Sequence, residues 1–370
     1  MILSEEEKKQ YNRHLILDEI GELGQLNLKE AKVAIIGAGG LGCPVLQYLC
    51  AAGVGQLTVV DGDTIDSSNL QRQVLYGKGD IGQNKAKVAV RALKTKNAFV
   101  TFIAISQNVN QENIISIIKD STIVVDCSDN FNTRYLINDA CVLTHKTLVF
   151  GSILKFEGQL GVCNVKESNG LYSPNYRDLY PETPLAADSP SCSEVGVLGV
   201  LPSLIGTMQA SEVIKIIVGL DGVLIGKVLS YNLLNHQTYT LSYERDPENQ
   251  LNEPDFDLYT FPYASFCGAE VTQLNIDDFY KKISTKNTVL IDVRTSDERK
   301  KESIGGLHIP FEFVESRIGE FKRETTYLFY CKSGFRSANA AQLLINQNFL
   351  TDQVFSLKGG LEAIEKSNSN

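Results

Sequence analysis

The sequence predicts an α/β protein that combines a doubly wound, mostly parallel β-sheet with a second, smaller α/β domain. Short β-branched runs alternate with segments whose apolar residues recur at helical spacing, which favours parallel strands joined by helices. A chain of 370 residues, 43 % of them hydrophobic, is long enough for about two or three cores. An acidic stretch at 244–257 interrupts the alternation and indicates a boundary between two domains.

The elements follow this division in order. Within residues 1–245 the predicted strands are KVAIIG, QLTVVD, VTFIAI, TIVVDCSD and TLVFGS, and the predicted helices include CPVLQYLCAAG and NKAKVAVRALKTKN. Residues 246–268 are predicted to form an acidic, solvated linker. Within residues 269–370 strands are predicted at TVLIDVR, GLHIP, TYLFYC and QVFSLKGG, and helices at IDDFYKKIS and SANAAQLLINQ.

Charge and composition exclude several classes of protein. The net charge is −9 and the chain has no basic run, which argues against a nucleic-acid partner. The N-terminus is charged and no apolar run approaches the ~20 residues that span a bilayer, so we expect neither a signal sequence nor a membrane helix. The eight cysteines contain no Cys-x-x-Cys pair, which indicates reduced thiols. We therefore expect a cytoplasmic protein.

A glycine fingerprint follows the first predicted strand. Gly37, Gly39, Gly40 and Gly42, in GAGGLG, precede a predicted helix, as in Rossmann-like nucleotide sites. Bare backbone amides and the N-terminus of a helix attract phosphate, and glycine lets the phosphate approach closely. Asp61 ends the next strand, where it can accept hydrogen bonds from ribose hydroxyls. Taken alone, this pattern favours NAD.

The residues downstream favour a triphosphate instead. Asn69, Arg72 and Gln73 lie in the loop after the acidic strand, and Lys85 opens a helix. NAD has only two phosphates, which the glycine loop already binds, whereas two added cations suit a triphosphate whose terminal part must leave. Asp129, at the carboxyl end of another strand, is a candidate Mg²⁺ ligand. Alternatively, Arg72 and Lys85 are ordinary surface cations and Asp129 caps the next helix.

Several motifs together resemble the MoeB/ThiF (E1-like) adenylating family over about residues 1–245: YNRHLIL, GAGGLG, DGDTIDSSNLQRQ, GQNKAKVA and DCSDNFNTRYLIND. The resemblance implies ATP-dependent adenylation of the C-terminal Gly-Gly carboxylate of a ubiquitin-fold sulfur carrier protein. It implies that the glycine loop and Asp61 hold the nucleotide, and that Asp129 holds Mg²⁺. It also implies that Asn69, Arg72 and Lys85 bind and polarise the phosphates.

Two further roles follow from this resemblance. Arg13, in YNRH, matches the arginine that enters the ATP site of the partner subunit, which implies a homodimer. Cys192, in CSEVGVLG before a long apolar segment, matches the cysteine that forms a thioester or acyl disulfide with the carrier. A thiol near a helix N-terminus can have a lowered pKa, although a small, partly buried thiol is the alternative.

The pattern departs from the family at its zinc ligands. Many relatives hold a structural zinc ion with two Cys-x-x-Cys pairs. Here PNYRDLYP has Asn175 and Asp178 at the first pair of positions. The segment FPYASFCG, taken as the second pair, keeps Cys267 but has Ala264 in place of its mate. We therefore predict no structural zinc.

A second candidate site lies in the C-terminal domain. YCKSGFRS places Cys331 after a strand and before a tight loop and a helix, so that backbone amides can converge on its sulfur and favour the thiolate. Cys331 and Arg336 are spaced Cys-x4-Arg, whereas a cysteine-dependent phosphatase has Cys-x5-Arg, so the loop suits sulfur better than phosphate. The alternative is an inert cysteine at the end of a core strand.

With VLIDVRTSDER upstream and LKGG downstream, residues 270–370 resemble a single-domain rhodanese, whose cysteine carries a persulfide. Asp292 and Arg294 match a structural pair of that family. The resemblance implies that a persulfide donor such as a cysteine desulfurase loads Cys331, and that this sulfur converts the activated carrier into a thiocarboxylate. The fused arrangement resembles MoeZ-type and MOCS3/Uba4-type activators, which serve molybdopterin, thiamine or tRNA thiolation.

Two other functions stay in consideration. An NAD-dependent oxidoreductase would use the glycine loop and Asp61 but leave Arg72, Lys85 and Cys192 without a role. An E1-like scaffold that only docks a carrier, beside an active rhodanese, is favoured by the lost zinc ligands. The retained candidate residues at both sites argue against such a scaffold.

Overall fold

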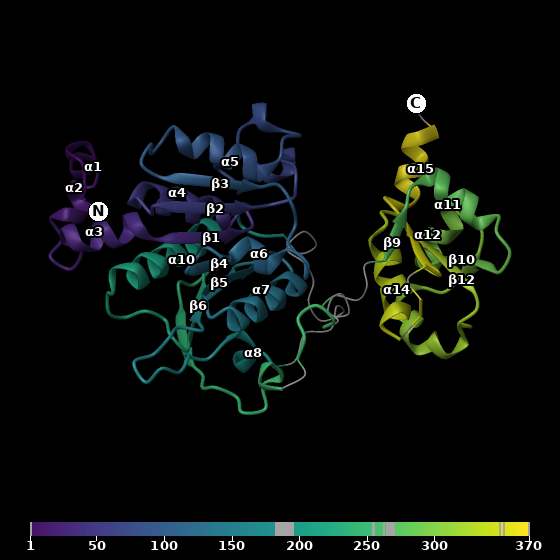
Figure 1. Cartoon of the computed structure of the whole chain (residues 1–370). Coiled ribbons are helices and arrows are strands. Elements are labelled where there is room, and N and C mark those ends of the chain that lie inside the picture. Colours follow the sequence, from purple (N-terminus) through teal and green to yellow (C-terminus); the bar gives the residue numbers. More distant parts are fainter. Residues whose placement is uncertain are drawn as a thin grey trace. The chain divides into compact units, whose positions relative to one another are not determined.

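The structure, a computed structural model, describes residues 2–181, 196–253, 256–261, 263, 271–347, 349–350 and 352–368 (Figure 1). The chain forms two compact units, of which the first extends to Phe261 and the second contains the C-terminal part. Each unit has its own sheet and its own hydrophobic core. Both are α/β, which confirms the predicted fold class.

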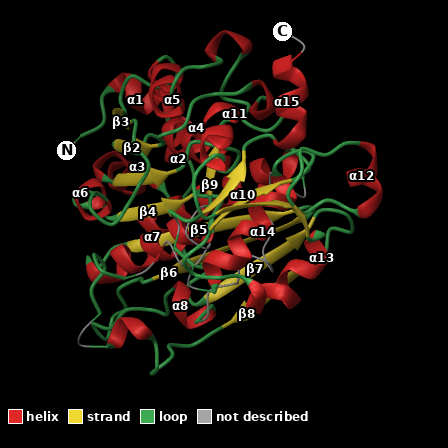
Figure 2. Cartoon of the chain, turned by 90° about the vertical axis from the view of Figure 1, so that its right-hand side faces the viewer, coloured by secondary structure: helices red, strands yellow, loops and turns green. Residues whose placement is uncertain are grey.

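The first unit is built on a sheet of eight strands among the described residues, in the order β3-β2-β1-β4-β5-β6-β7-β8 (Figure 2). The strands are β1 Lys32–Ile36, β2 Gln56–Val60, β3 Thr101–Ile105, β4 Ile123–Asp126, β5 Thr147–Leu154, β6 Glu157–Cys163, β7 Lys227–Asn232 and β8 Thr238–Ser242. The strands from β3 to β5 pair in parallel, and β6 to β8 extend the sheet in antiparallel pairs.

Helices cover both faces of the parallel part, which is why its central strands are apolar along their length. The helices of this unit are α1 Glu5–Gln10, α2 Asn12–Leu15, α3 Gly21–Glu30, α4 Gly42–Ala52, α5 Lys85–Lys94, α6 Ile114–Ile118, α7 Phe131–Leu143, α8 Tyr176–Leu179 and α10 Val200–Val218, with short 3₁₀ turns η1 Ser67–Asn69, η2 Lys78–Asp80 and η4 Gln250–Asn252. Val33 and Ile35 of β1 share one core with α4, α5 and α10. α7 packs against β4 and β5.

α10 is the one helix in the described part of the chain whose length and composition would allow it to cross a membrane, with 19 residues and a mean hydropathy of 1.2. This corrects the expectation that no apolar run approaches that length. α10 packs against α3, α4, β5 and β6. Gln209 and Glu212 are buried within it, and they bond to the Asp126 carbonyl and the Leu224 amide, each at 2.9 Å. These contacts make α10 a core helix of the first unit.

The second unit has a five-stranded sheet among its described residues, in the order β11-β10-β12-β13-β9, with every pair parallel. Its elements are β9 Thr272–Leu274, α11 Ile276–Ile283, β10 Thr288–Asp292, α12 Ser296–Lys301, β11 Leu307–His308, α13 Phe311–Val314, η6 Glu315–Glu320, β12 Thr326–Tyr330, α14 Phe335–Asn346, β13 Val354–Leu357 and α15 Gly360–Asn368. Along β12, Tyr327, Phe329 and Cys331 join one core, and Leu328 and Tyr330 join the other. The central strand therefore delivers Cys331 to the carboxyl edge of the sheet.

The described part of the predicted linker packs on the first unit. Leu258 is buried, and the Gln111 side-chain amide donates to the carbonyl oxygens of Leu258, Tyr259 and Phe261 at 2.7, 3.0 and 2.9 Å. This part of the segment therefore differs from the solvated linker expected from its acidic composition, because Leu258 is buried and Gln111 binds the backbone around it. The boundaries at 245 and 268 stay a prediction.

Candidate active sites

The glycine loop connects β1 to α4 and has no room for side chains at its two ends. A β-carbon at Gly37, whose φ is +96°, would lie 2.6 Å from the Cys127 carbonyl oxygen. A β-carbon at Gly42 would collide with the carbonyl oxygen of Gly37 itself. α4 then tolerates Pro44 in its first turn, where a missing N–H costs little. The loop therefore presents bare backbone at a helix N-terminus.

Two side chains from other elements hold this loop in place. Asp61, after β2, accepts hydrogen bonds from the Ala38 and Asp63 amides, both at 2.8 Å. Burial raises the pKa of Asp61. The hydroxyl of Tyr76, which the sequence did not single out, donates to the Ala38 carbonyl at 2.7 Å. The loop is therefore held in one shape from both sides.

The predicted phosphate-binding residues lie around the loop. Lys85, the first residue of α5, is largely buried and pairs with the exposed Asp63 at 2.8 Å, so it is not an ordinary surface cation. Gln73 is 4 % exposed, and its Oε1 has no hydrogen-bond partner in the described part of the chain. Arg72 donates to the Ser68 carbonyl at 3.1 Å. An open amide cradle, an unsatisfied acceptor and a buried cation fit a nucleotide with a phosphate chain.

Asn69, the last predicted member of this group, ends η1. Its side-chain oxygen accepts a hydrogen bond from the Asp66 amide at 3.2 Å, while the Asp66 carboxylate accepts one from the Ser68 amide at 2.8 Å. This reciprocal cap fixes the turn that leads to the phosphate-binding cations. Asn69 therefore has a structural role in this turn.

Asp129 follows β4 and is exposed. The next helix is capped by Asn130, which accepts the Thr133 amide at 2.9 Å, so the alternative that Asp129 is the cap is wrong. Asp129 instead lies in an exposed part of a loop that the buried side chain of Arg134 stabilises. Arg134 donates from Nε to Asp126 at 2.9 Å and from Nη2 to the Ser128 carbonyl at 3.1 Å. In the sequence, Arg134 of the motif NTRYLIND could have indicated that this loop is stabilised by a buried cation.

These groups meet because of the strand order. β1 lies between β2 and β4, and the chain crosses from β3 at one side of the sheet to β4 at the other. The glycine loop, Asp61 and Asp129 therefore lie at the carboxyl ends of adjacent strands, where open α/β sheets bind ligands. In the described part of the chain no group of three or more His, Cys, Asp or Glu side chains is arranged to hold a metal ion. A lone Asp129 fits Mg²⁺ that is held chiefly by phosphate and water oxygens.

Arg13 is not brought to this site. It is exposed on α2, whose preceding residue Tyr11 packs against Gly53, where a β-carbon would lie 2.5 Å from the Tyr11 ring. Asn97 also donates to the Tyr11 hydroxyl at 2.9 Å. Gly53 caps the carboxyl end of α4, and the glycine loop lies at its amino end, about 16 Å away at 1.5 Å per residue. Arg13 is thus anchored far from the glycine loop of its own chain.

Cys192 lies outside the described residues. The residues that follow it in the sequence are described from 196 onward. Gly199 lies against Gln71, where a β-carbon would be 2.5 Å from the Gln71 carbonyl oxygen, and Pro202 of α10 lies beside Gly40. The start of α10 is therefore next to the phosphate-binding region.

Asn175 and Asp178, which stand at the first pair of zinc-ligand positions, form a hydrogen-bonded cluster with Asn249 that we call the amide clasp. Asp178 accepts the Asn175 amide at 2.7 Å and the Asp246 amide at 3.1 Å, and it accepts the side-chain N–H of Asn249. Residues 175–178 are thus joined to 246–249, whereas the second pair of zinc-ligand positions was predicted at Ala264 and Cys267. Those two residues lie outside the described part, and the absence of zinc stays a prediction.

Arg177, inside the clasp segment, is buried and pairs with Asp139 of α7 at 2.7 Å. Its guanidinium lies 4.9 Å from the ring centre of Tyr135 and 4.8 Å from that of Phe261. These two cation–π contacts add to the ion pair. Arg177 therefore fixes α8 to α7 and to the described end of the acidic segment.

The cysteine loop of the second unit is closed around a buried sulfur. Gly334 donates its amide to the Cys331 Sγ at 3.2 Å, and the Ser337 hydroxyl lies 3.5 Å from the same atom. Ser356 of β13 donates to Ser337 at 2.9 Å. Gly360 packs so closely on the loop that a β-carbon there would lie 2.5 Å from the Cys331 carbonyl. One backbone amide and one hydroxyl thus face the sulfur at the end of the strand.

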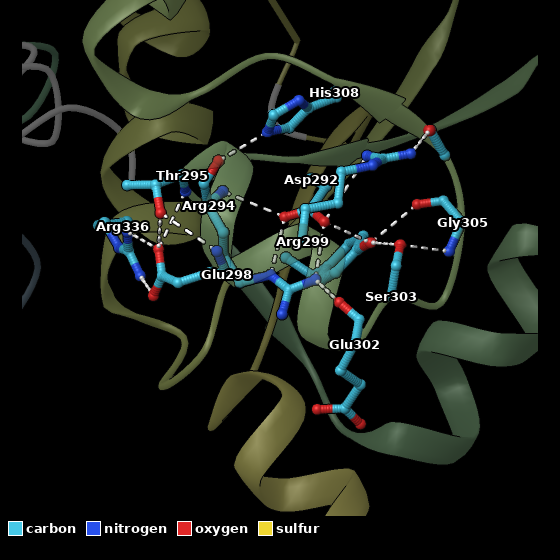
Figure 3. A network of polar contacts seen from close by, with 12 residues as sticks. Asp292, Arg294, Thr295, Glu298, Arg299, Glu302, Ser303, Gly305, His308 and Arg336 are labelled. Atoms are coloured by element: carbon cyan, nitrogen blue, oxygen red, sulfur yellow. Dashed lines mark hydrogen bonds and ion pairs between the residues drawn. The ribbon is translucent and has the colours of Figure 1, made fainter.

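The other predicted residues of this unit belong to a network of polar contacts (Figure 3). Asp292 and Arg294 are buried and bonded at 2.8 and 3.0 Å, and the Tyr330 hydroxyl donates to Asp292 at 2.8 Å. These bonds lower the pKa of Asp292 against the effect of its burial. Arg336, predicted to be catalytic, binds Glu298 through both terminal nitrogens. Glu298 was not singled out by the sequence.

A model of the ThiF family matches residues 11–252, well over half of the chain. The chain belongs to the ThiF family. A model of the rhodanese-like domain matches residues 275–367. ThiF-family adenylation followed by a rhodanese-like domain is therefore the organisation of this chain, which confirms the predicted resemblance.

Relatives of this ThiF-family chain match it over most of its length. A Mycobacterium tuberculosis protein named probable adenylyltransferase/sulfurtransferase MoeZ is 38 % identical, over 98 % of this chain and 94 % of its own. Xenopus laevis adenylyltransferase and sulfurtransferase MOCS3 is 34 % identical over 95 % of this chain and 85 % of its own. A Thermus thermophilus sulfur carrier protein adenylyltransferase is 43 % identical over 72 % of this chain and 98 % of its own. The chain is thus an adenylyltransferase joined to a sulfurtransferase, and ATP use follows from that class.

The solved structures support the fold. Escherichia coli MccB, crystallised with MccA-N7isoASN, aligns with a TM-score of 0.57 at 23 % identity, over 65 % of this chain and 74 % of MccB. The aligned share corresponds in extent to the first unit. The likeness confirms an E1-like architecture for the ThiF part.

Proposed function

We propose that this chain adenylates the C-terminal Gly-Gly carboxylate of a ubiquitin-fold sulfur carrier, and then replaces AMP with sulfur from Cys331 to give a thiocarboxylate. The observation that carries the proposal is the glycine loop, held by Asp61, at the switch point of the first sheet, with Asp129 after the adjacent strand β4. Such a carrier serves molybdopterin or thiamine biosynthesis, and the reaction takes place in the cytoplasm, where thiols stay reduced.

The first step needs charge neutralisation more than a general base. A carboxylate oxygen attacks the α-phosphorus, the bond to the β-phosphate oxygen breaks, and pyrophosphate leaves with the electron pair. The attacking group is already anionic, so positioning and electrostatics carry the step. Lys85 exchanges Asp63 for a phosphate, and the exposed Asp63 returns to water. Mg²⁺ near Asp129 would offset the charge of the phosphate oxygens.

The second step uses a persulfide on Cys331, supplied by a donor such as a cysteine desulfurase. Its terminal sulfur attacks the acyl carbon, and AMP leaves, which gives an acyl disulfide between the carrier and Cys331. A second thiol, for which we propose Cys192, attacks the Cys331 sulfur of that disulfide. The thiocarboxylate leaves, and a dithiol reductant reduces the remaining disulfide.

The test is isotope exchange between labelled pyrophosphate and ATP in the presence of a panel of Gly-Gly carriers. We expect exchange with at least one carrier, lowered about 100-fold or more by Asp129→Ala. Asp120→Ala, which removes an exposed carboxylate elsewhere on the same unit, is the matched control and should exchange normally. No exchange with any carrier would favour the E1-like scaffold.

We also propose a homodimer in which Arg13 completes the partner's site, and the distance of Arg13 from the glycine loop of its own chain supports this arrangement. Mixing two inactive variants tests this arrangement. Arg13→Ala and Asp129→Ala subunits should regain exchange when mixed, because one of the two sites in the mixed dimer then has both residues. Failure to regain activity, with mixed dimers present by native mass spectrometry, would contradict the shared site.

A further inference from the structure

The cysteine loop carries two cations, and each one is already paired with a carboxylate. Arg336 donates from Nη1 and Nη2 to the two Glu298 oxygens at 2.8 and 2.6 Å (Figure 3). Lys332 Nζ lies 3.9 Å from Glu362 Oε1. The positive charges of the loop that surrounds the Cys331 sulfur are therefore offset by carboxylates from two other elements, α12 and α15.

Glu298 is held in place independently of Arg336. It is the third residue of α12, and it accepts the Thr295 amide at 2.9 Å and the Thr295 hydroxyl at 3.0 Å in a capping box. Arg336, followed by the Thr295 hydrogen bonds, lowers the pKa of Glu298 to about 2. Both side chains are about 30 % exposed, at 31 % for Glu298 and 30 % for Arg336, so the pair faces the solvent from which a donor arrives.

Sulfur donors differ in the charge they bring to this loop. A small oxoanion such as thiosulfate carries two negative charges to a thiolate, so its transition state gains from an unpaired cation close by. A persulfide brings one negative charge at most. The bidentate contact with Glu298 occupies both terminal nitrogens of Arg336, which are the groups that would bind an oxoanion.

We propose that Glu298 sets the donor specificity of Cys331, because it neutralises Arg336 and so makes the loop discriminate against small dianionic donors. The inference rests on the proposed sulfurtransferase function of Cys331. With thiosulfate, the Cys331 thiolate attacks the sulfane sulfur, the sulfur–sulfur bond breaks, and sulfite leaves with the electron pair. The product on the enzyme is the same persulfide that an organic persulfide gives.

The experiment compares two donors with the full chain. Sulfur transfer to Cys331 is followed by intact mass and by sulfite release, with thiosulfate and with a low-molecular-weight cysteine persulfide. We expect the wild type to favour the persulfide. Glu298→Gln, which retains a side chain able to complete the capping box, should raise kcat/KM for thiosulfate about tenfold and change the persulfide rate little.

Two variants separate this effect from general changes of charge and structure. Glu320→Gln removes an exposed carboxylate that pairs with Arg317, and it should leave the donor ratio unchanged. The double variant Glu298→Gln with Arg336→Gln should lose the increase in kcat/KM for thiosulfate, because that increase depends on the unpaired Arg336 guanidinium. An unchanged ratio in Glu298→Gln, or efficient use of thiosulfate by the wild type, would overturn the inference. Absence of sulfur transfer from either donor would instead refute the proposed function.

Discussion

The glycine loop and the cysteine loop are both turns from a parallel strand into a helix, but they differ in how complete they are. In the cysteine loop the polar groups find partners within the chain: Gly334 and Ser337 face the sulfur, and Arg336 binds Glu298. Beside the glycine loop, Gln73 Oε1 lacks a partner in the described residues, and Asp129 is exposed. A thiol that carries sulfur needs a prebuilt ring, whereas a nucleotide site is completed by its ligand.

The largest effect expected is the loss of sulfur transfer in Cys331→Ser. Serine retains the size of the side chain but cannot form a persulfide, so transfer should fall to background while pyrophosphate exchange continues. Ser333→Ala, a change at an exposed position of the same loop, is the control and should transfer sulfur normally. A parallel loss of exchange in Cys331→Ser would show that the two loops do not work independently, which would break the comparison.

The second prediction concerns the buried support of Asp129. Arg134→Met leaves Asp126 buried without its cation, which should destabilise the first unit by about 3–5 kcal/mol. Arg91→Met removes an exposed pair with Asp80 and should cost at most ~1 kcal/mol. Urea unfolding measures the two costs, and hydrogen exchange with mass spectrometry locates them. Faster exchange in the second unit would contradict the assignment.

Gln73→Leu sharpens the contrast between an incomplete and a complete site. Removing a buried acceptor that has no partner should stabilise the nucleotide-free protein by about 1 kcal/mol. The same change should weaken ATP binding about tenfold, because the acceptor meets a donor only when the nucleotide is bound. Thermal unfolding without ligand and calorimetric titration with ATP measure the two effects. A fall in both stability and affinity would mean that Gln73 is already satisfied.

The smallest effect is a dependence on pH in the second unit. The pKa of Glu298 is about 2 in the folded chain and near 4.5 without its partners, so its contribution to stability is present above pH 4.5 and is lost as the pH falls toward 2. Because the pair is partly exposed, we expect about 1 kcal/mol. The difference between the unfolding free energies of wild type and Glu298→Gln should shrink on acidification. A difference that grows would contradict the ion pair.

Motif spacing in the sequence predicted the site residues that lie within a single loop, but it did not predict contacts between residues far apart in the chain. The glycines and Cys331 are read from spacing within a single loop, because each loop is formed by consecutive residues. Arg336 was also found by spacing, but its partner Glu298 is 38 positions away and belongs to another helix. The Tyr76 hydroxyl likewise donates to the Ala38 carbonyl, 38 positions away, and no motif spacing predicts this contact.

Composition alone was a poor guide to burial in two segments, for related reasons. The acidic segment after residue 245 looked solvated, yet Leu258 in it is buried and Gln111 binds the backbone around it. The run that became α10 was judged too short to span a membrane, although the helix has the length to do so. What determines the outcome in both cases is the packing partner, and an average over composition does not contain it.

The amide clasp has a consequence for a protein that handles reactive sulfur. Persulfides and disulfides exchange with thiolates, and cysteines that bind a structural metal are thiolates. Asn175, Asp178 and Asn249 offer only oxygen and nitrogen atoms to their surroundings. Under the proposed function, sulfane sulfur that escapes from Cys331 therefore finds no thiolate to modify in this clasp, and the segment keeps its shape under conditions that would strip a thiolate-bound ion.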